Sequence, residues 1–166
     1  SYFSTPNVVT TWPELDLRAR AQIDSIPNTY AFLADKISSF WFAMQPVGAT
    51  QKLILRVGSV GAVVSIAFPT SQLGVRDWYR ATYDAATGDV KFFTADGNLE
   101  APAISDYTQL GTTQNSGAAA IAVTTSGFLA GAYSPNPPPH PFDGDIYRAQ
   151  VYNEIDGTTP VVDFTA

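Results

Sequence analysis

The stretch 77-DWYRATYDAATGDVKFFTADG-97 contains two runs of β-forming residues separated by a turn. Both runs are rich in aromatic and β-branched residues, which fit the pleated, half-buried surface of a sheet. In the turn "AATGDV", Gly88 stands where a tight hairpin requires a positive φ, and Gly97 follows an aspartate in the same way. We therefore predict a β-hairpin that consists of Trp78 to Asp84 and Asp89 to Ala95.

Short strands of this kind are predicted along most of the chain, and little helix is expected beyond a turn. Leu15 to Ile23 alternates apolar residues with Asp16, Arg18, Arg20 and Gln22, which is the period of a strand with one buried and one solvent-facing side. Similar segments recur at about 8 to 12 residues, the spacing of a β-sandwich or barrel. They are YAFLADK (30–36), SFWFAMQ (39–45), QKLILRV (51–57), AVVSIAF (62–68) and, with small buried side chains, NSGAAAIAVTTSG (115–127).

Length and charge restrict the class of protein. The 166 residues fit one domain, 1–166, that buries about two thirds of the surface of its unfolded chain. A net charge of −6 with only nine scattered Lys and Arg residues argues against nucleic acid and anionic membranes as partners. The absence of cysteine excludes disulfides and thiolate zinc sites. Because no signal-peptide pattern follows Ser1, we expect a mature chain or an excised domain.

Three segments resemble parts of one known fold. The hairpin 77–97 resembles the central hairpin of laminin G-like, concanavalin A-like jelly rolls, with its Trp-led strand, Thr-Gly turn and final Asp-Gly. "GFLAGAYSPNPPPHPFDGDIYRAQVYN" (127–153) is similar to the closing strand pair of that fold, and "ELDLRARAQID" (14–24) to its first core strand. The resemblance implies an all-β jelly-roll sandwich of two antiparallel sheets. The patches "LDLRA" and "FDGDIYRAQVY" are similar to laminin G-like domains in minor tail and other virion proteins of actinobacteriophages.

Catalysis has little support in the sequence. Glycosidases of related jelly rolls need paired carboxylates on one strand face. Glu14 and Asp16 imitate the start of such a motif, but the second glutamate is missing, and we expect both side chains to face solvent. The single histidine, His140, lies among prolines, and no nucleophile elbow or phosphate-binding loop is present. We therefore predict that the protein is not an enzyme, with a weak glycosidase as the least favoured alternative.

Candidate ligand contacts are sought among aromatic residues outside the predicted strands, because sugar sites use exposed aromatic faces and polar loop groups. These aromatic residues are Trp12, Tyr107, Tyr133 and Phe142. We take Trp12, Tyr133 and Phe142, with His140 in the proline loop, as candidate ligand-binding residues. The alternatives are that Trp12 is a lid or a partner contact, and that Tyr133 and Phe142 staple the loop.

Calcium is the one cofactor for which candidate ligands exist. Asp143 and Asp145 flank Gly144, and hard cations are bound by carboxylate and loop carbonyl oxygens. The simpler interpretation is that Asp143 and Gly144 form a turn, while Asp145 lies on the solvent face of the following strand. We therefore expect no cofactor and keep a calcium site at Asp143 and Asp145 as the alternative.

Three functions remain as hypotheses. The leading one, from the family resemblance, is a non-enzymatic virion domain on a phage tail or capsid surface that contacts other virion proteins and host-surface glycan. The alternative is an extracellular carbohydrate-binding module of a secreted bacterial protein, and a glycoside hydrolase comes third. Because open sandwiches must protect their edge strands, we expect a homo-oligomer or a part of a larger assembly.

Overall fold

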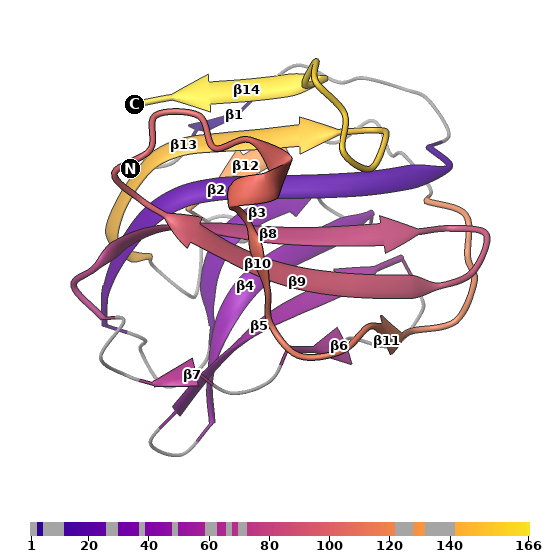
Figure 1. Cartoon of the computed structure of the whole chain (residues 1–166), viewed down its shortest axis with the longest axis horizontal. Coiled ribbons are helices and arrows are strands. Elements are labelled where there is room, and N and C mark those ends of the chain that lie inside the picture. Colours follow the sequence, from indigo (N-terminus) through magenta and orange to yellow (C-terminus); the bar gives the residue numbers. More distant parts are fainter. Residues whose placement is uncertain are drawn as a thin grey trace.

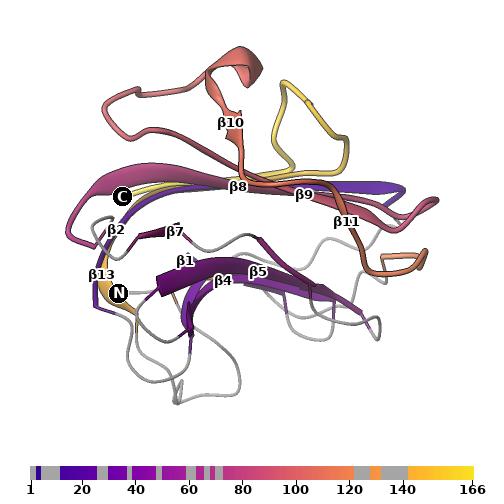
Figure 2. The same ribbon diagram turned by 60° about the horizontal axis from the view of Figure 1, so that its bottom comes forward.

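Two antiparallel β-sheets face each other in the structure of the chain (Figure 1). The computed structural model describes residues 3–4, 12–25, 30–36, 39–47, 50–58, 63–65, 68–69, 73–121, 128–131 and 142–166. Figure 2 shows the sheets as two stacked layers. The predicted sandwich of two antiparallel sheets is confirmed.

The front sheet, nearest the viewer in Figure 1, has the strand order β10-β9-β8-β2-β13-β14, and β11 also pairs with β9. It combines the first and the last long strands of the chain, β2 and β13, as central neighbours. Its members are β2 (Glu14–Ser25), β8 (Arg76–Asp84), β9 (Asp89–Asp96), β10 (Thr108–Gln109), β11 (Gln114–Asn115), β13 (Asp143–Tyr152) and β14 (Val162–Thr165).

The back sheet has the order β1-β12-β3-β4-β5-β6, and β7 also pairs with β5. Its members are β1 (Phe3–Ser4), β3 (Ala31–Lys36), β4 (Phe40–Val47), β5 (Thr50–Val57), β6 (Val63–Val64), β7 (Phe68–Pro69) and β12 (Phe128–Ala130). Within the predicted strand 62–68, the described residues form β6 and the first residue of β7, and Ser65 belongs to neither strand. The described residues hold one helix, a single 3-10 turn η2 (Ile104–Asp106), and none long and apolar enough to cross a membrane.

The core lies between the sheets and follows the two-residue period of the sequence. On β2, Leu17 lies opposite Ala81 of β8 on one side and Val151 of β13 on the other, and all three are buried. Back-sheet residues such as Phe42 and Leu55 belong to the same cluster. The apolar half of the β2 pattern therefore faces the interior, and its polar half lies on the outer face of the front sheet.

The predicted hairpin is confirmed as β8 and β9, but its two glycines serve different purposes. Gly88 has a φ of +79° at the turn, as expected. Gly97 does not have a positive φ, so that expectation was wrong. A Cβ atom at Gly97 would overlap the backbone of Arg76, so the close approach of two backbones requires glycine there.

The described part of segment 115–127 does not form the predicted buried strand. Residues 116–120 are irregular, Ala118 and Ala120 are exposed, and Ile121 makes an isolated bridge to Trp12. Both backbone groups of Ala119 bond to the Tyr83 hydroxyl instead of a strand partner. Residues 122–127 lie outside the described part of the chain.

Candidate functional site

A pocket of about 440 Å³ lies on the outer face of the front sheet. Figure 2 shows that two loops rise from this face, the 97–107 loop with η2 and the 153–160 loop between β13 and β14. The pocket lies between these loops, and its volume is within the range of small-molecule sites. Its lining comprises Arg18, Ala101, Pro102, Ala103, Ile104, Tyr107, Arg148, Gln150, Tyr152, Asp156, Gly157, Thr158, Pro160 and Asp163.

Asp16 and two arginines form a buried ionic network beneath the pocket. Asp16 is 0% exposed, so the expectation that it faces solvent was wrong. Arg80 donates from Nε and Nη2 to its two carboxylate oxygens, each at 2.8 Å, and Arg18 donates from Nη2 at 2.7 Å. Alternation correctly placed Asp16 on the polar face, but it carries no information about the loops that cover that face.

Contacts with the same network hold the 153–160 loop against the sheet. Asp156 accepts from Arg80 Nη2 at 2.5 Å, and its backbone N–H donates to Asp16 at 3.3 Å. The backbone N–H of Ile155 donates to Glu14 Oε2 at 2.7 Å, so Glu14 anchors a loop and does not simply face solvent. Asp156 has a φ of +60°, the one non-glycine residue with positive φ in the described chain. These contacts of Asp156 and Ile155 hold the loop in place and so keep Asp156 in its strained backbone conformation.

The buried Arg80 guanidinium remains a cation because its surroundings compensate the loss of water. Burial lowers the pKa of Arg80, but its hydrogen bonds and charge interactions with Asp16 and Asp156 outweigh this and raise the pKa overall. Aromatic rings also cover the cations. Arg18 lies 4.0 Å from the ring centroid of Tyr152, and Arg80 lies 4.8 Å from that of Phe93.

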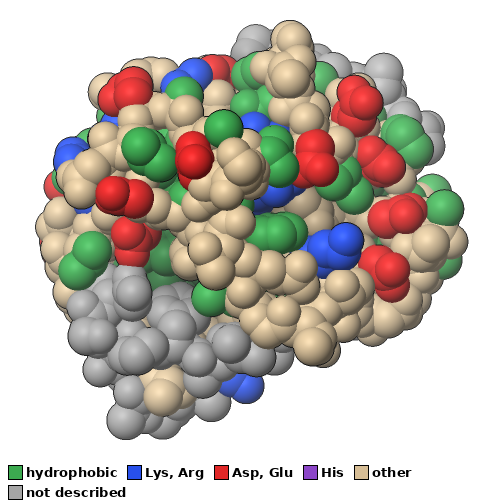
Figure 3. Space-filling view, in the orientation of Figure 1, with side chains coloured by type: hydrophobic (Ala, Val, Ile, Leu, Met, Phe, Trp, Pro, Cys, Tyr) green, Lys and Arg blue, Asp and Glu red, His purple; other side chains and the backbone are tan. Residues whose placement is uncertain are grey.

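A second ion pair forms the opposite side of the pocket. Arg148 donates to the two oxygens of Asp163 at 2.9 and 2.7 Å, and the amide nitrogen of Gln150 donates to the same carboxylate at 3.1 Å. The hydrogen bond from Arg148 lowers the pKa of Asp163 and outweighs the partial burial that raises it. Figure 3 shows this face of the molecule, with acidic side chains spread over it and basic ones between them.

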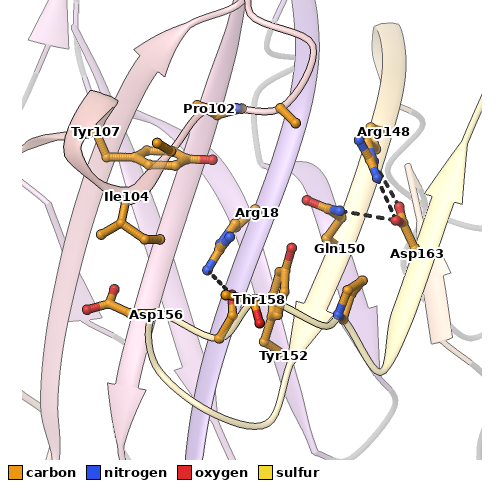
Figure 4. Close-up of a pocket in the computed structure, with 14 residues that line it drawn as sticks. Arg18, Pro102, Ile104, Tyr107, Arg148, Gln150, Tyr152, Asp156, Thr158 and Asp163 are labelled. Carbon is orange, nitrogen blue, oxygen red and sulfur yellow. Dashed lines mark hydrogen bonds and ion pairs between the residues drawn. The ribbon is translucent and has the colours of Figure 1, made fainter.

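The buried hydroxyl of Tyr107, which lines the pocket, has no hydrogen-bond partner among the described residues. The residue is 9% exposed, and burial raises the pKa of its phenol. Figure 4 shows its ring across the pocket, with the hydroxyl pointing toward the side where Arg18 and Gln150 lie. Trp78 packs in the same buried cluster and donates from Nε1 to the Leu99 carbonyl at 2.9 Å, which fixes the loop that carries Tyr107.

Of the four residues predicted to bind a ligand, the two that the structure describes do not line this pocket. Trp12 is 3% exposed and belongs to the core, with its ring 6.3 Å from that of Phe40, so packing replaces the predicted contact role. Phe142 is partly buried against the same core. Tyr133 and His140 lie outside the described residues.

The predicted calcium ligands both lie on β13 and are exposed. Asp143 accepts a hydrogen bond from the Ser25 hydroxyl, and Asp145 pairs in register with Gln22. Asp143 is thus part of the strand, paired with Ser25, and not of a preceding turn. A Cβ at Gly144 would overlap the Gln22 carbonyl, so the close approach of the two strands requires glycine there. Within the described residues, no three His, Cys, Asp or Glu side chains gather to hold a metal ion. Calcium binding at Asp143 and Asp145 stays the less favoured alternative.

The polar residues that line the pocket were not predicted from the sequence, although a weak signal was present. "LDLRAR" and "YRAQVY" place Arg18, Arg148 and Gln150 at alternate positions, which become one face when β2 and β13 pair. Tyr107 stood out as an aromatic residue outside the predicted strands. Nothing in the sequence indicated that its loop folds over that face.

Comparison with known proteins shows the fold of the chain. No protein-family model and no curated protein matches it. A heptameric SAP-like pentraxin from Limulus polyphemus superimposes with a TM-score of 0.66 and 14% identity, over 92% of this chain and 70% of the pentraxin chain. A protein from Bacteroides ovatus provisionally described as carbohydrate-binding superimposes with a TM-score of 0.65 and 14% identity. The match covers 92% of this chain and 41% of the Bacteroides chain.

The third similar structure comprises the LG4-5 domains of the mouse laminin alpha1 chain. Its TM-score is 0.55 and its identity 11%, over 91% of this chain and 39% of the laminin chain. The chain therefore spans about two fifths of the length of the laminin and Bacteroides structures. Together with the two antiparallel sheets, these matches show a laminin G-like, concanavalin A-like jelly-roll fold.

Proposed function

We propose that this jelly-roll domain binds carbohydrate without acting on it, and that the pocket over the front sheet is its binding site. The observation that carries the proposal is the make-up of that pocket. Its walls include the apolar surfaces of Pro102, Ile104 and Pro160, and its floor holds polar side chains fixed by hydrogen bonds. Sugar rings present both apolar C–H faces and hydroxyl groups, so they suit a site that combines the two.

The fold adds support of a more general kind. One similar structure, from Bacteroides ovatus, is described as carbohydrate-binding, but an identity of 14% indicates only a shared fold. Because one fold serves many functions, sugar binding is inferred from the pocket and not from the fold.

The carboxylates of the pocket favour binding over hydrolysis. Glycosidases need a general acid whose pKa is raised. Asp163 has a lowered pKa because Arg148 donates to it, and Asp156 is paired with Arg80. Glu14, the glutamate considered for catalysis, accepts a backbone hydrogen bond from Ile155. These groups have structural partners, in keeping with a domain that does not catalyse hydrolysis.

A pocket-filling variant tests the proposal. Ala103 is exposed and lines the pocket, so Ala103→Trp places an indole where the ligand would lie. Ala86, exposed in the β8–β9 turn, does not line the pocket and serves as a matched control. In affinity electrophoresis against a panel of polysaccharides, we expect Ala103→Trp to abolish the binding that Ala86→Trp and the native protein retain. Failure of the native protein to bind any polysaccharide would contradict the proposal.

The finer placement of the domain remains a prediction. Attachment to a phage tail or capsid and contacts with other virion proteins derive from the sequence resemblance alone. Assembly into an oligomer is expected because an open sandwich must protect its edge strands. Detection of the protein in purified virions by mass spectrometry would support this placement, and detection only in culture supernatant would support a secreted module. Light scattering of the isolated chain reports its oligomeric state.

A further inference from the structure

We propose that the pocket selects uncharged sugars over acidic ones, and that the Tyr107 hydroxyl is a specificity-determining contact with a sugar hydroxyl. This inference rests on the proposed carbohydrate-binding function and adds the class of sugar. Two independent features of the pocket lead to it: the pairing of its charges and its one buried hydroxyl without a partner.

Every charged side chain that lines the pocket already has an opposite charge beside it. The lining contains two arginines, Arg18 and Arg148, and two aspartates, Asp156 and Asp163. Arg148 pairs with Asp163 at 2.7 Å, while Arg18 and Asp156 pair with the buried Asp16 and Arg80 at 2.7 and 2.5 Å. With Asp16 and Arg80 included, three positive and three negative charges cancel.

This charge balance disfavours a charged ligand. A sugar carboxylate needs a cation as its partner, and here it would have to compete with an aspartate already bound to each arginine. The chain as a whole carries a net charge of −6, which adds long-range repulsion toward a polyanion. A neutral sugar meets neither obstacle, because its hydroxyl groups exchange hydrogen bonds without adding charge.

Tyr107 supplies the unused hydrogen-bonding group. A buried hydroxyl without a partner is costly, and native structures leave few of them. The hydroxyl is closed off from solvent but points toward the side of the pocket where Arg18 and Gln150 lie, so a sugar hydroxyl that reaches it on binding would remove the cost (Figure 4). Gln150 lies on the facing side, and its amide nitrogen is bound to Asp163 at 3.1 Å, which turns its oxygen toward the pocket. A sugar with adjacent hydroxyls can donate to Gln150 and bond to Tyr107 together.

An array of neutral oligosaccharides beside their uronic acid counterparts tests the selectivity. The sugars would be based on glucose, galactose, mannose and xylose, with glucuronic and galacturonic acid as the acidic members. We expect the native protein to bind at least one neutral sugar roughly tenfold more tightly than its acidic counterpart. Equal or tighter binding of the acidic member would overturn this inference and leave the proposed function intact. No binding to any sugar would overturn both.

Two variants then test the named residues by calorimetry with the sugar that binds best. Tyr107→Phe should weaken binding roughly tenfold, since it removes one hydrogen bond. Tyr79→Phe is its matched control, because Tyr79 is also buried with an unpartnered hydroxyl but lies in the core between the sheets. Equal effects of the two variants would overturn the role of Tyr107.

Asp163→Asn tests the charge argument directly. The substitution keeps the shape of the side chain but releases Arg148 from its ion pair, which leaves the pocket with one unpaired positive charge. We expect the preference for the neutral sugar over its uronic acid, measured as the ratio of their affinities, to fall several-fold. An unchanged preference would overturn the charge-pairing explanation.

Discussion

At the scale of single residues, the interior of the sandwich contains two tyrosines of β8 in opposite situations. Tyr79 is 1% exposed and its hydroxyl has no hydrogen bond in the described structure. Tyr83 accepts from the backbone N–H of Ala119 and donates to its carbonyl, both at 2.9 Å. The two hydroxyl groups therefore contribute very differently to stability, although both belong to the same strand and point to the same sheet face.

This contrast gives a prediction for the free energy of unfolding. Tyr83→Phe should cost about 1 to 2 kcal/mol, because Ala119 loses partners for two backbone groups. Tyr79→Phe should be neutral or stabilising by up to about 1 kcal/mol, because it removes a buried hydroxyl without a partner. Urea denaturation of both variants provides the measurement. A larger loss for Tyr79→Phe than for Tyr83→Phe would show that Tyr79 has a partner, such as a buried water molecule.

At the scale of elements, the 153–160 loop depends on one residue in an unusual conformation. Asp156 has a φ of +60°, and its side chain is 57% exposed although it pairs with the buried Arg80. Its backbone N–H also donates to Asp16, a contact that any residue except proline can keep. The backbone conformation and the ion pair can therefore be separated by substitution.

Asp156→Gly should be milder than Asp156→Ala. Both variants lose the ion pair with Arg80, but glycine adopts a positive φ without strain, whereas alanine pays an added cost of about 1 kcal/mol. We expect thermal or urea unfolding to rank native, glycine and alanine proteins in that order of decreasing stability. If alanine matched glycine, the loop would have relaxed from the conformation described here.

Most of the long strands of the front sheet could be predicted from the sequence. The long alternating segments became β2, β8, β9 and β13, because two-residue alternation and turn glycines are local properties. The Ala-rich 115–127 segment was predicted wrongly over 116–120, where Tyr83 takes the backbone groups of Ala119. That contact joins residues far apart in the chain, so no local pattern could reveal it.

For the whole molecule, the sheet order predicts which backbone opens last. β2 lies between β8 and β13 and pairs with both over most of its length, whereas β14 is bonded on one side only within the described sheet. In hydrogen exchange followed by mass spectrometry, we expect peptides from β2 to exchange slowest and those from β10, β11 and β14 to exchange far sooner. Uniform exchange across the front sheet would contradict this order.

The sequence by itself determined the sandwich, because strands, turns and the apolar face of each strand follow from neighbouring residues. It also indicated Tyr107 as an aromatic residue outside the strands. Only the tertiary structure decided that Asp16 is buried, that Trp12 packs in the core, and that a pocket lies over the front sheet. The physical reason is that the pocket joins β2, β13 and two loops, and both the pairing of its charges and the isolation of the Tyr107 hydroxyl exist only once these segments meet.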